Sequence, residues 1–146
     1  MKTKLLSLVL VAVMCLFAFS ACGDDALEKI TVNVKATADG SIFVDTVVII
    51  EFEKGYTPTA LEAIRQACTE LELAYTLWNN DMSLQSISGE GVGPYDSSVE
   101  GANGETMWWR CTVNGIESED LPIGEIAINN GDTVEIFFEK FVMSDK

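Results

Sequence analysis

The sequence predicts an α+β domain in which a single helix covers one face of a mixed β-sheet. Two stretches rich in β-branched residues, 30–36 and 43–52, lie on either side of a turn. One amphipathic helix follows them, and the rest of the chain has the pattern of short strands separated by turns. Because the sequence contains one helix and enough strands for one sheet, it predicts a domain of two layers.

The first two strands are predicted to form a hairpin. Residues 30–36 (ITVNVKA) alternate apolar and polar side chains, which is the pattern of a half-buried strand. Residues 43–52 (FVDTVVIIEF) form the second strand, and Asp39-Gly40 between them is a turn signal. Lys54-Gly55 ends the hairpin.

The helix is predicted from about Ala60 to Leu73. Thr59-Ala60-Leu61-Glu62 has the form of a capping box, in which the first and last side chains satisfy each other's backbone N–H groups. Apolar residues then recur at helical spacing on one face, which we expect to meet the sheet. These residues are Leu61, Ile64, Cys68 and Leu71.

The chain after the helix is predicted to form further strands. Met107–Val113 (MWWRCTV) is followed by Asn114-Gly115, a pair typical of a type I′ hairpin turn, in which both residues need positive φ. Asn130-Gly131-Asp132 is another turn, before a last strand at 133–141. Shorter or weaker strands are predicted at 73–78 and 82–88. This order fits a β-grasp, ubiquitin-like layout for a domain at 30–142, followed by a tail at 143–146.

The N-terminus has the pattern of an export signal. Lys2 and Lys4 precede an almost entirely apolar stretch, 5–21, which is short for a membrane span and typical of a secretory h-region. Phe19-Ser20-Ala21-Cys22 resembles the lipobox of bacterial lipoproteins, although Leu is commoner than Phe at its first position. Simple secretion, with cleavage after Ser20, is the alternative.

The lipobox resemblance implies a signal peptide at 1–21 and a lipid on Cys22, with a short tether at 22–29. It also implies a protein anchored by its lipid at the extracytoplasmic face of a bacterial cell membrane.

Composition excludes several kinds of function. The chain has 23 acidic and 9 basic residues and no His, for a formal net charge of −14. Such a balance argues against nucleic acid as a partner. The lack of His excludes His-based catalytic triads and His-ligated metal sites, and we expect no metal. Carboxylate pairs such as Glu51 and Glu53 lie two residues apart and would line a wet sheet face. No activated nucleophile is recognisable, so we expect no enzyme.

Cys68 and Cys111 are predicted to form a disulfide. Cys15 lies in the signal peptide and Cys22 carries the proposed lipid, which leaves one pair in a chain exported to an oxidising compartment. Strand alternation places Cys111 on the same face as Trp109, and that face can meet Cys68 on the helix. The alternative is two buried free thiols.

Trp108 and Arg110 are the first candidate ligand-binding residues. Alternation puts them on the face opposite Trp109, for which we expect a structural role in the core. An exposed Trp beside a cation can stack on a planar ligand and donate a hydrogen bond. Alternatively, a loop folds over Trp108, and Arg110 only neutralises Glu105 or Glu117.

Tyr95 and Asn103 complete the candidate ligand-binding set. Both lie in the stretch Gly89–Thr106, which is rich in Gly and is predicted to be a long loop. A plain solvated loop is the alternative. The nearby acidic residues Glu117, Glu119 and Asp120 lack the ladder of a dedicated calcium loop.

Four segments together resemble the transcobalamin C-terminal-like domain, a β-grasp module also found on bacterial surface proteins. They are the helix start 59–64, Ser86–Gly89, Trp109–Gly115 and Asn130–Val134, and the resemblance covers roughly Lys29 to Lys140. Cys111 stands where that family commonly has an aromatic residue, and Trp108 is an additional aromatic.

The resemblance implies the fold and suggests a corrinoid such as cobalamin as the ligand. Animal cobalamin carriers clamp the corrinoid between this domain and a helical barrel, which we do not expect in this chain. A cell-surface module that binds a protein or glycan is therefore the alternative function.

Overall fold

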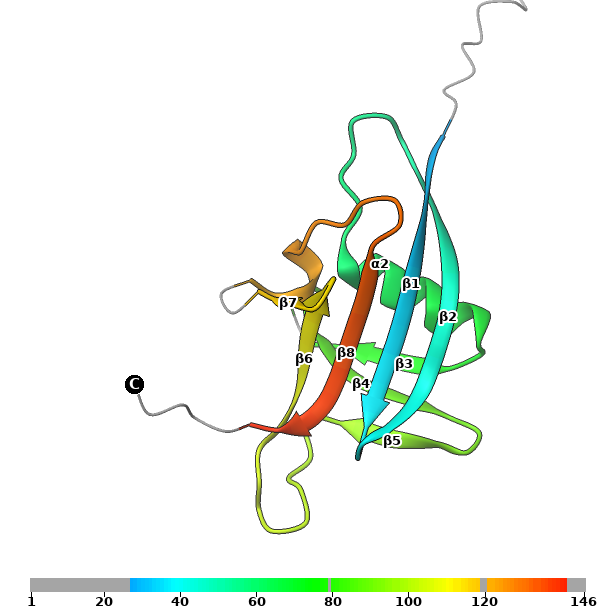
Figure 1. Cartoon of the computed structure of the whole chain (residues 1–146). Coiled ribbons are helices and arrows are strands. Elements are labelled where there is room, and N and C mark those ends of the chain that lie inside the picture. Colours follow the sequence, from blue (N-terminus) through cyan, green and yellow to red (C-terminus); the bar gives the residue numbers. More distant parts are fainter. Residues whose placement is uncertain (1–26, 79, 119–120, 142–146) are drawn as a thin grey trace, which may run out of the picture.

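The computed structural model describes residues 27–78, 80–118 and 121–141. It confirms the α+β class, with one α-helix, a short 3-10 helix and two sheets in these described ranges (Figure 1). The predicted signal peptide and Cys22 lie outside the described residues. Within those residues, no helix has the length and apolar character needed to cross a membrane. The elements are β1 (Glu28–Ala38), β2 (Ser41–Phe52), α2 (Ala60–Glu70), β3 (Ala74–Leu77), β4 (Leu84–Gly89), β5 (Val92–Asp96), β6 (Met107–Val113), β7 (Ile116–Glu117), η2 (Ile123–Glu125) and β8 (Thr133–Lys140).

The larger sheet has the strand order β2-β1-β8-β6-β7. β1 and β8 run parallel at its centre, and the other pairs are antiparallel. This is the mixed β-grasp sheet predicted from the order of elements. β1 starts at Glu28, before the predicted strand, because Glu28 already pairs with Phe52 of β2. The strand at Met107–Val113 and the turn at Asn114-Gly115, with φ of 53° and 76°, are confirmed.

The smaller sheet, β3-β4-β5, was not predicted as a separate layer. Its strand β5 occupies part of Gly89–Thr106, so the prediction of one continuous loop there is wrong. Gly91, at a φ of +73°, turns the chain back so that β5 pairs with β4. β5 is an edge strand, where Pro94 can omit one ladder hydrogen bond.

α2 lies behind the larger sheet and packs mainly on β2, as Figure 1 shows. Its predicted capping box is present, since the Glu62 carboxylate accepts the backbone N–H of Thr59 at 2.8 Å. The helix ends at Glu70 rather than at residue 73, because Glu72 takes a left-handed conformation, with a φ of 56°. The N–H of Leu73 then donates to the carbonyl of Cys68 at 2.8 Å, which closes the helix end.

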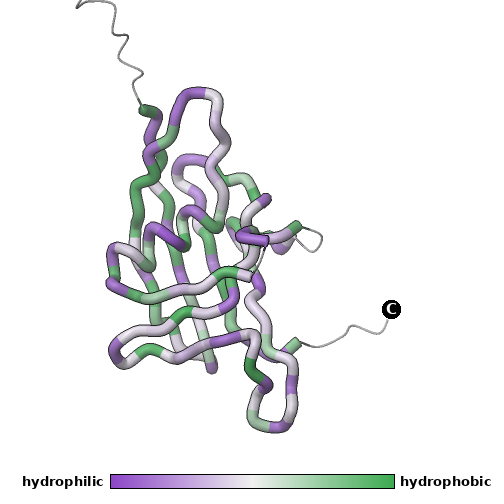
Figure 2. Tube along the Cα trace, turned by 180° about the vertical axis from the view of Figure 1, so that it is seen from behind, coloured by the Kyte–Doolittle hydropathy of each residue, from purple (hydrophilic) through white to green (hydrophobic). Residues whose placement is uncertain are grey.

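The core lies between the larger sheet and the layer formed by α2 and the smaller sheet. Apolar residues alternate with polar ones along the strands, which is visible from behind in Figure 2. Trp109 is 7% exposed, as predicted for a core residue, and its Nε1–H donates to the carbonyl of Gln85 at 3.0 Å. This bond joins β6 to β4.

Cys68 and Cys111 both face the core, as predicted, but they are free thiols and the predicted disulfide is absent. α2 packs mainly on β2, whereas Cys111 lies on β6, which is separated from β1 by β8. Neighbouring strands are about 4.8 Å apart, and a disulfide needs Cα atoms within about 7 Å. Facing the same core was therefore not sufficient for the two thiols to meet. Burial raises the pKa of Cys68 to about 11 and that of Cys111 to about 12.

Candidate functional site

A cleft of about 210 Å³ follows the free edge of β6. β7 pairs with β6 only at Thr112 and Val113, so the backbone of residues 107–111 is unpaired on that side. The cleft brings Trp108 and Arg110 together, as the sequence predicted. Its other walls come from η2 and the segment before it and from the start of β4, and include Leu121, Pro122, Ile123 and Leu84.

Trp108 is half-buried at this cleft. Its ring meets Phe141 edge to face, with the ring centroids 5.3 Å apart. The indole Nε1–H is buried and has no hydrogen-bond acceptor among the described residues. Buried donors are normally paired, because an unpaired one loses its hydration without compensation. Phe141 is the aromatic neighbour of Trp108.

Arg110 is held firmly on the outer face of the sheet. Its Nε donates to Glu139 at 2.6 Å, and a weaker ion pair joins its Nη1 to Glu117 at 3.7 Å. The guanidinium also lies 4.2 Å from the centroid of the Phe137 ring, a cation–π contact. The hydrogen bond to Glu139 raises the pKa of Arg110. The guanidinium therefore stays positively charged, and the Glu139 carboxylate balances its charge. The predicted pairing with Glu117 is present, and Glu105 pairs instead with Lys140.

Thr112 is a second unpaired group on the same face of β6. It is 5% exposed, and its Oγ1 has no partner within the described part of the chain. Two buried polar groups thus lie on either side of Arg110 without partners among the residues that the structure describes. A ligand with hydrogen-bonding groups could satisfy the one that borders the cleft, which is Trp108.

Tyr95 and Asn103 do not join this cleft. Tyr95 lies in β5, and its ring packs between Phe43 and Phe138 on the inner side, at centroid distances of 4.9 and 5.6 Å. Asn103 is exposed in the turn that follows Gly101. Their roles as ligand contacts remain predictions, but the structure does not bring them together with Trp108 and Arg110.

The acidic residues give no metal centre in the described part of the chain. No three of the Asp, Glu and Cys side chains described here lie close enough to hold an ion. Glu119 and Asp120 fall outside the described residues, and Glu117 is engaged by Arg110.

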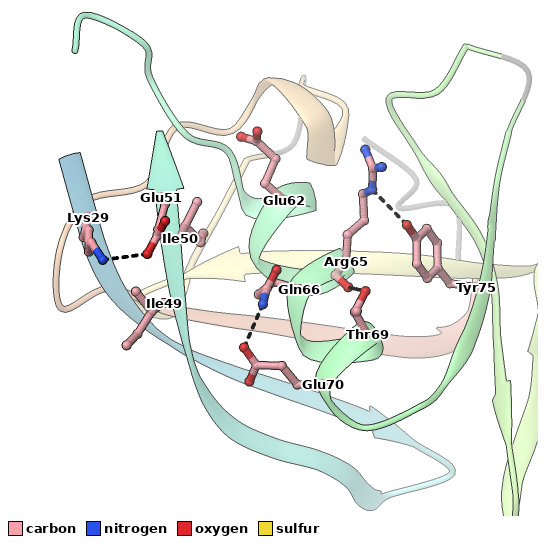
Figure 3. A pocket seen from close by; sticks show the side chains of 10 residues that line it. All are labelled: Lys29, Ile49, Ile50, Glu51, Glu62, Arg65, Gln66, Thr69, Glu70 and Tyr75. Atoms are coloured by element: carbon pink, nitrogen blue, oxygen red, sulfur yellow. Dashed lines mark hydrogen bonds and ion pairs between the residues drawn. The ribbon is translucent and has the colours of Figure 1, made fainter. Parts of the chain in front are cut away.

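A larger groove, of about 740 Å³, lies between the outer edge of β2 and α2 (Figure 3). Its β2 wall carries Ile49, Ile50 and Glu51, and Glu51 pairs with Lys29 at 2.6 Å. Its α2 wall carries a row of polar side chains, and Tyr75 of β3 closes one end. The α2 residues are Glu62, Arg65, Gln66, Thr69 and Glu70.

Sequence reasoning missed the partners of Trp108 and Arg110. Glu139, Phe137 and Phe141 lie on β8 or just after it, on the face opposite Ile136 and Phe138. The alternation of 133–141 gives that face, but not the register that places Arg110 beside Phe137. Nor could it show that the segment 121–126 returns to the edge of β6.

The fold is similar to that of haptocorrin in complex with Cbi. The match has a TM-score of 0.56 at 15% identity, and covers 79% of this chain and 26% of that one. The chain therefore spans about a quarter of the length of that haptocorrin. A protein of Ruminococcus gnavus ATCC 29149 described as a "putative metal binding protein" matches with a TM-score of 0.44 at 15% identity, over 77% of this chain and 99% of that one.

No family model matches the sequence, and no curated protein matches it either. The likeness to haptocorrin is one of fold.

Proposed function

We propose that this chain is a non-catalytic ligand-binding domain whose ligand is a corrinoid held at the edge of β6. One observation carries the proposal: Trp108, whose buried indole N–H has no acceptor among the described residues, lines a cleft beside Arg110. The fold that the domain shares with haptocorrin, a protein crystallised with Cbi, supports the choice of ligand class.

The size of the cleft defines how such a ligand would bind. A volume of about 210 Å³ is below the range of pockets that enclose drug-sized ligands. The corrin ring would therefore lie over the surface, and one amide arm would enter the cleft and accept the Trp108 N–H. With no His in the chain, the protein offers no imidazole to cobalt.

Calorimetric titration of the piece Gly23–Lys146 with cobinamide and cyanocobalamin tests this proposal. We expect saturable heat at micromolar concentration, and tighter binding of cobinamide, because the acidic protein repels the nucleotide phosphate of cyanocobalamin. Trp108→Ala should weaken binding at least tenfold, or about 1.4 kcal/mol. Trp78→Ala, at an exposed Trp outside the cleft, is the matched control and should bind normally.

We further propose that the domain is anchored to the membrane through a lipid on Cys22. The lipobox-like residues 19–22 support it. Expression in a bacterium fed a labelled fatty acid should label the wild type and leave Cys22→Ser unlabelled. Equal labelling of both would remove the lipoprotein assignment.

A cell-surface module that binds a protein or glycan is the second candidate function. The observation in its favour is the outer side of β2, which has no paired strand among the described residues. An envelope protein or glycan that co-purifies with the wild type would support this function. Pulldowns without any enriched partner would count against it.

A further inference from the structure

We propose that the groove between β2 and α2 binds an extended protein segment in which basic and β-branched residues alternate. The inference rests on the second candidate function and names its partner class. It is independent of the corrinoid site, because the groove shares no lining residue with the cleft at β6.

β2 is suited to accept an additional strand. It has 12 residues, and its pairing with β1 runs without interruption from Val44 to Phe52. Half of the backbone groups of an antiparallel edge strand point away from its partner, and an extended peptide can bind them. Long edges are usually blocked by Pro, Lys or a bulge. The stretch 44–52 has no Pro, Lys or bulge, and its two charged residues, Asp45 and Glu51, are both acidic.

The β2 side chains on the sheet face without a helix determine which residues the peptide should carry at every second position. Val47 and Ile49 are each 55% exposed on the sheet face that carries no helix. Side chains of an added strand would lie about 5 Å from these two residues. β-branched residues fit this position, because they pack well on a pleated, half-exposed surface.

The other face of the added peptide would meet α2, and the side chains of α2 determine the other half of the peptide pattern. In Figure 3, Glu62, Gln66 and Glu70 form a row along α2 that faces the edge of β2. Glu70 is exposed and can pair with a basic side chain of the peptide. The Glu62 carboxylate already accepts hydrogen bonds from Thr59 and Tyr56, and it adds negative charge to the same wall.

Electrostatics favour cations in this groove. Its lining holds three carboxylates and two cations, and the pairing of Lys29 with Glu51 leaves Glu62 and Glu70 against Arg65. The last turn of α2 carries no basic residue, so Glu70 adds to the negative end of the helix dipole. A second copy of this chain is a poor occupant, because Asp45 and Glu51 flank its own edge and each copy carries a net charge of −14.

The direct test uses a fluorescein-labelled peptide of about nine alternating Lys and Val residues, followed by anisotropy with the full domain. We expect saturable binding that weakens with salt, and at least tenfold weaker binding of the same peptide with Glu in place of Lys. A Lys–Val peptide N-methylated at alternate residues should also lose at least tenfold, because it cannot complete the strand ladder. Equal binding of the methylated peptide would overturn the strand-addition mode.

Variants of the protein locate the site. Glu70→Gln should raise the dissociation constant about two- to fivefold, the range of an exposed ion pair. Glu90→Gln removes the same charge from the β4–β5 turn, outside the groove, and should have no such effect. Backbone amide shifts should change along 44–52. Equal effects of the two variants, or shifts confined to β6, would show unspecific attraction and contradict the proposal.

A photo-crosslinker at position 49 separates this inference from the function on which it rests. An envelope protein captured there whose contacting segment lacks basic residues would overturn the peptide pattern and leave the interaction function standing. If the peptide does not bind and the crosslinker captures no protein, the peptide-binding inference and the surface-interaction function are both overturned. The proposed corrinoid binding would be unaffected.

Discussion

Trp108 and Trp109 are neighbours in one strand, yet their surroundings differ in every respect that matters for function. Trp109 points into the core, and its N–H donates to the Gln85 carbonyl. Trp108 points to the outer face, packs against Phe141, and its N–H has no acceptor in the described residues. The inner side chains of β6 thus stabilise the fold, whereas the outer ones form the face on which we propose that a ligand binds.

The same contrast extends to the next pair along β6. Cys111 is buried beside the core, and burial raises its pKa to about 12. Arg110 lies on the outer face, held by Glu139 and the Phe137 ring. Successive residues of a strand alternate between its faces, so substitutions in β6 should fall into two classes with different readouts.

The largest expected effect belongs to the inner face. Trp109→Ala should destabilise the domain by about 3–5 kcal/mol, because it leaves a cavity in the core and removes the partner of the Gln85 carbonyl. Trp108→Ala should cost less than about 2 kcal/mol, because that ring is only half-buried. Urea denaturation of both variants measures this difference. Equal losses would break the contrast between the two faces.

A smaller effect should appear at alkaline pH. Well below pH 9, the ordinary pKa of a thiol, Cys111 is protonated in both the folded and unfolded states, so its contribution to stability is fully present. As pH rises from 9 towards 12, the unfolded chain loses this proton first, and stability falls. The loss should be about 1.4 kcal/mol by pH 10.

Urea titrations at pH 7 and pH 10 check this effect. Cys111→Ala should lose less stability between the two pH values than the wild type does. The same titrations of Cys68→Ala give an independent check, since the pKa of Cys68 is raised as well, to about 11. Variants that decline as steeply as the wild type would place the alkaline loss elsewhere.

Free thiols are a further consequence of the structure. Unfolding the purified domain in an alkylating agent, without reductant, should modify both Cys68 and Cys111. Mass spectrometry counts the added groups. A protein that takes up label only after reduction would restore the disulfide predicted from the sequence.

The smallest effect belongs to the outer face. Arg110→Gln should cost about 1 kcal/mol or less, because the ion pair with Glu139 is partly exposed and screened by solvent. A double-mutant cycle with Glu139→Gln isolates the pair, and high salt should reduce its coupling energy. A coupling that is insensitive to salt would contradict the placement of this pair at the surface.

The sequence predicted the features that depend on local spacing. The strand at Met107–Val113, the Asn114-Gly115 turn and the Thr59–Glu62 capping box are each determined by residues close together in the chain. Alternation also assigned Trp108 and Trp109 to opposite faces. Those predictions needed only the period of a strand or a helix.

The predictions that failed concern features that depend on which elements become neighbours in the fold. Cys68 and Cys111 were assigned to the right layer, but their lateral positions across the sheet come from strand order. Tyr95 belongs to a strand because β5 pairs with β4, and its ring packs between Phe43 and Phe138, which are both distant in sequence. The pairing of Arg110 with Glu139 likewise comes from the register between β6 and β8.

Calorimetric titration of Gly23–Lys146 with cobinamide, for the wild type and Trp108→Ala, tests the central claim most directly. We predict saturable heat for the wild type at micromolar concentration, and at least tenfold weaker binding for the variant. Absence of heat with the wild type up to about 1 mM, an affinity near −4 kcal/mol, would contradict the account of the outer face of β6 as a corrinoid site.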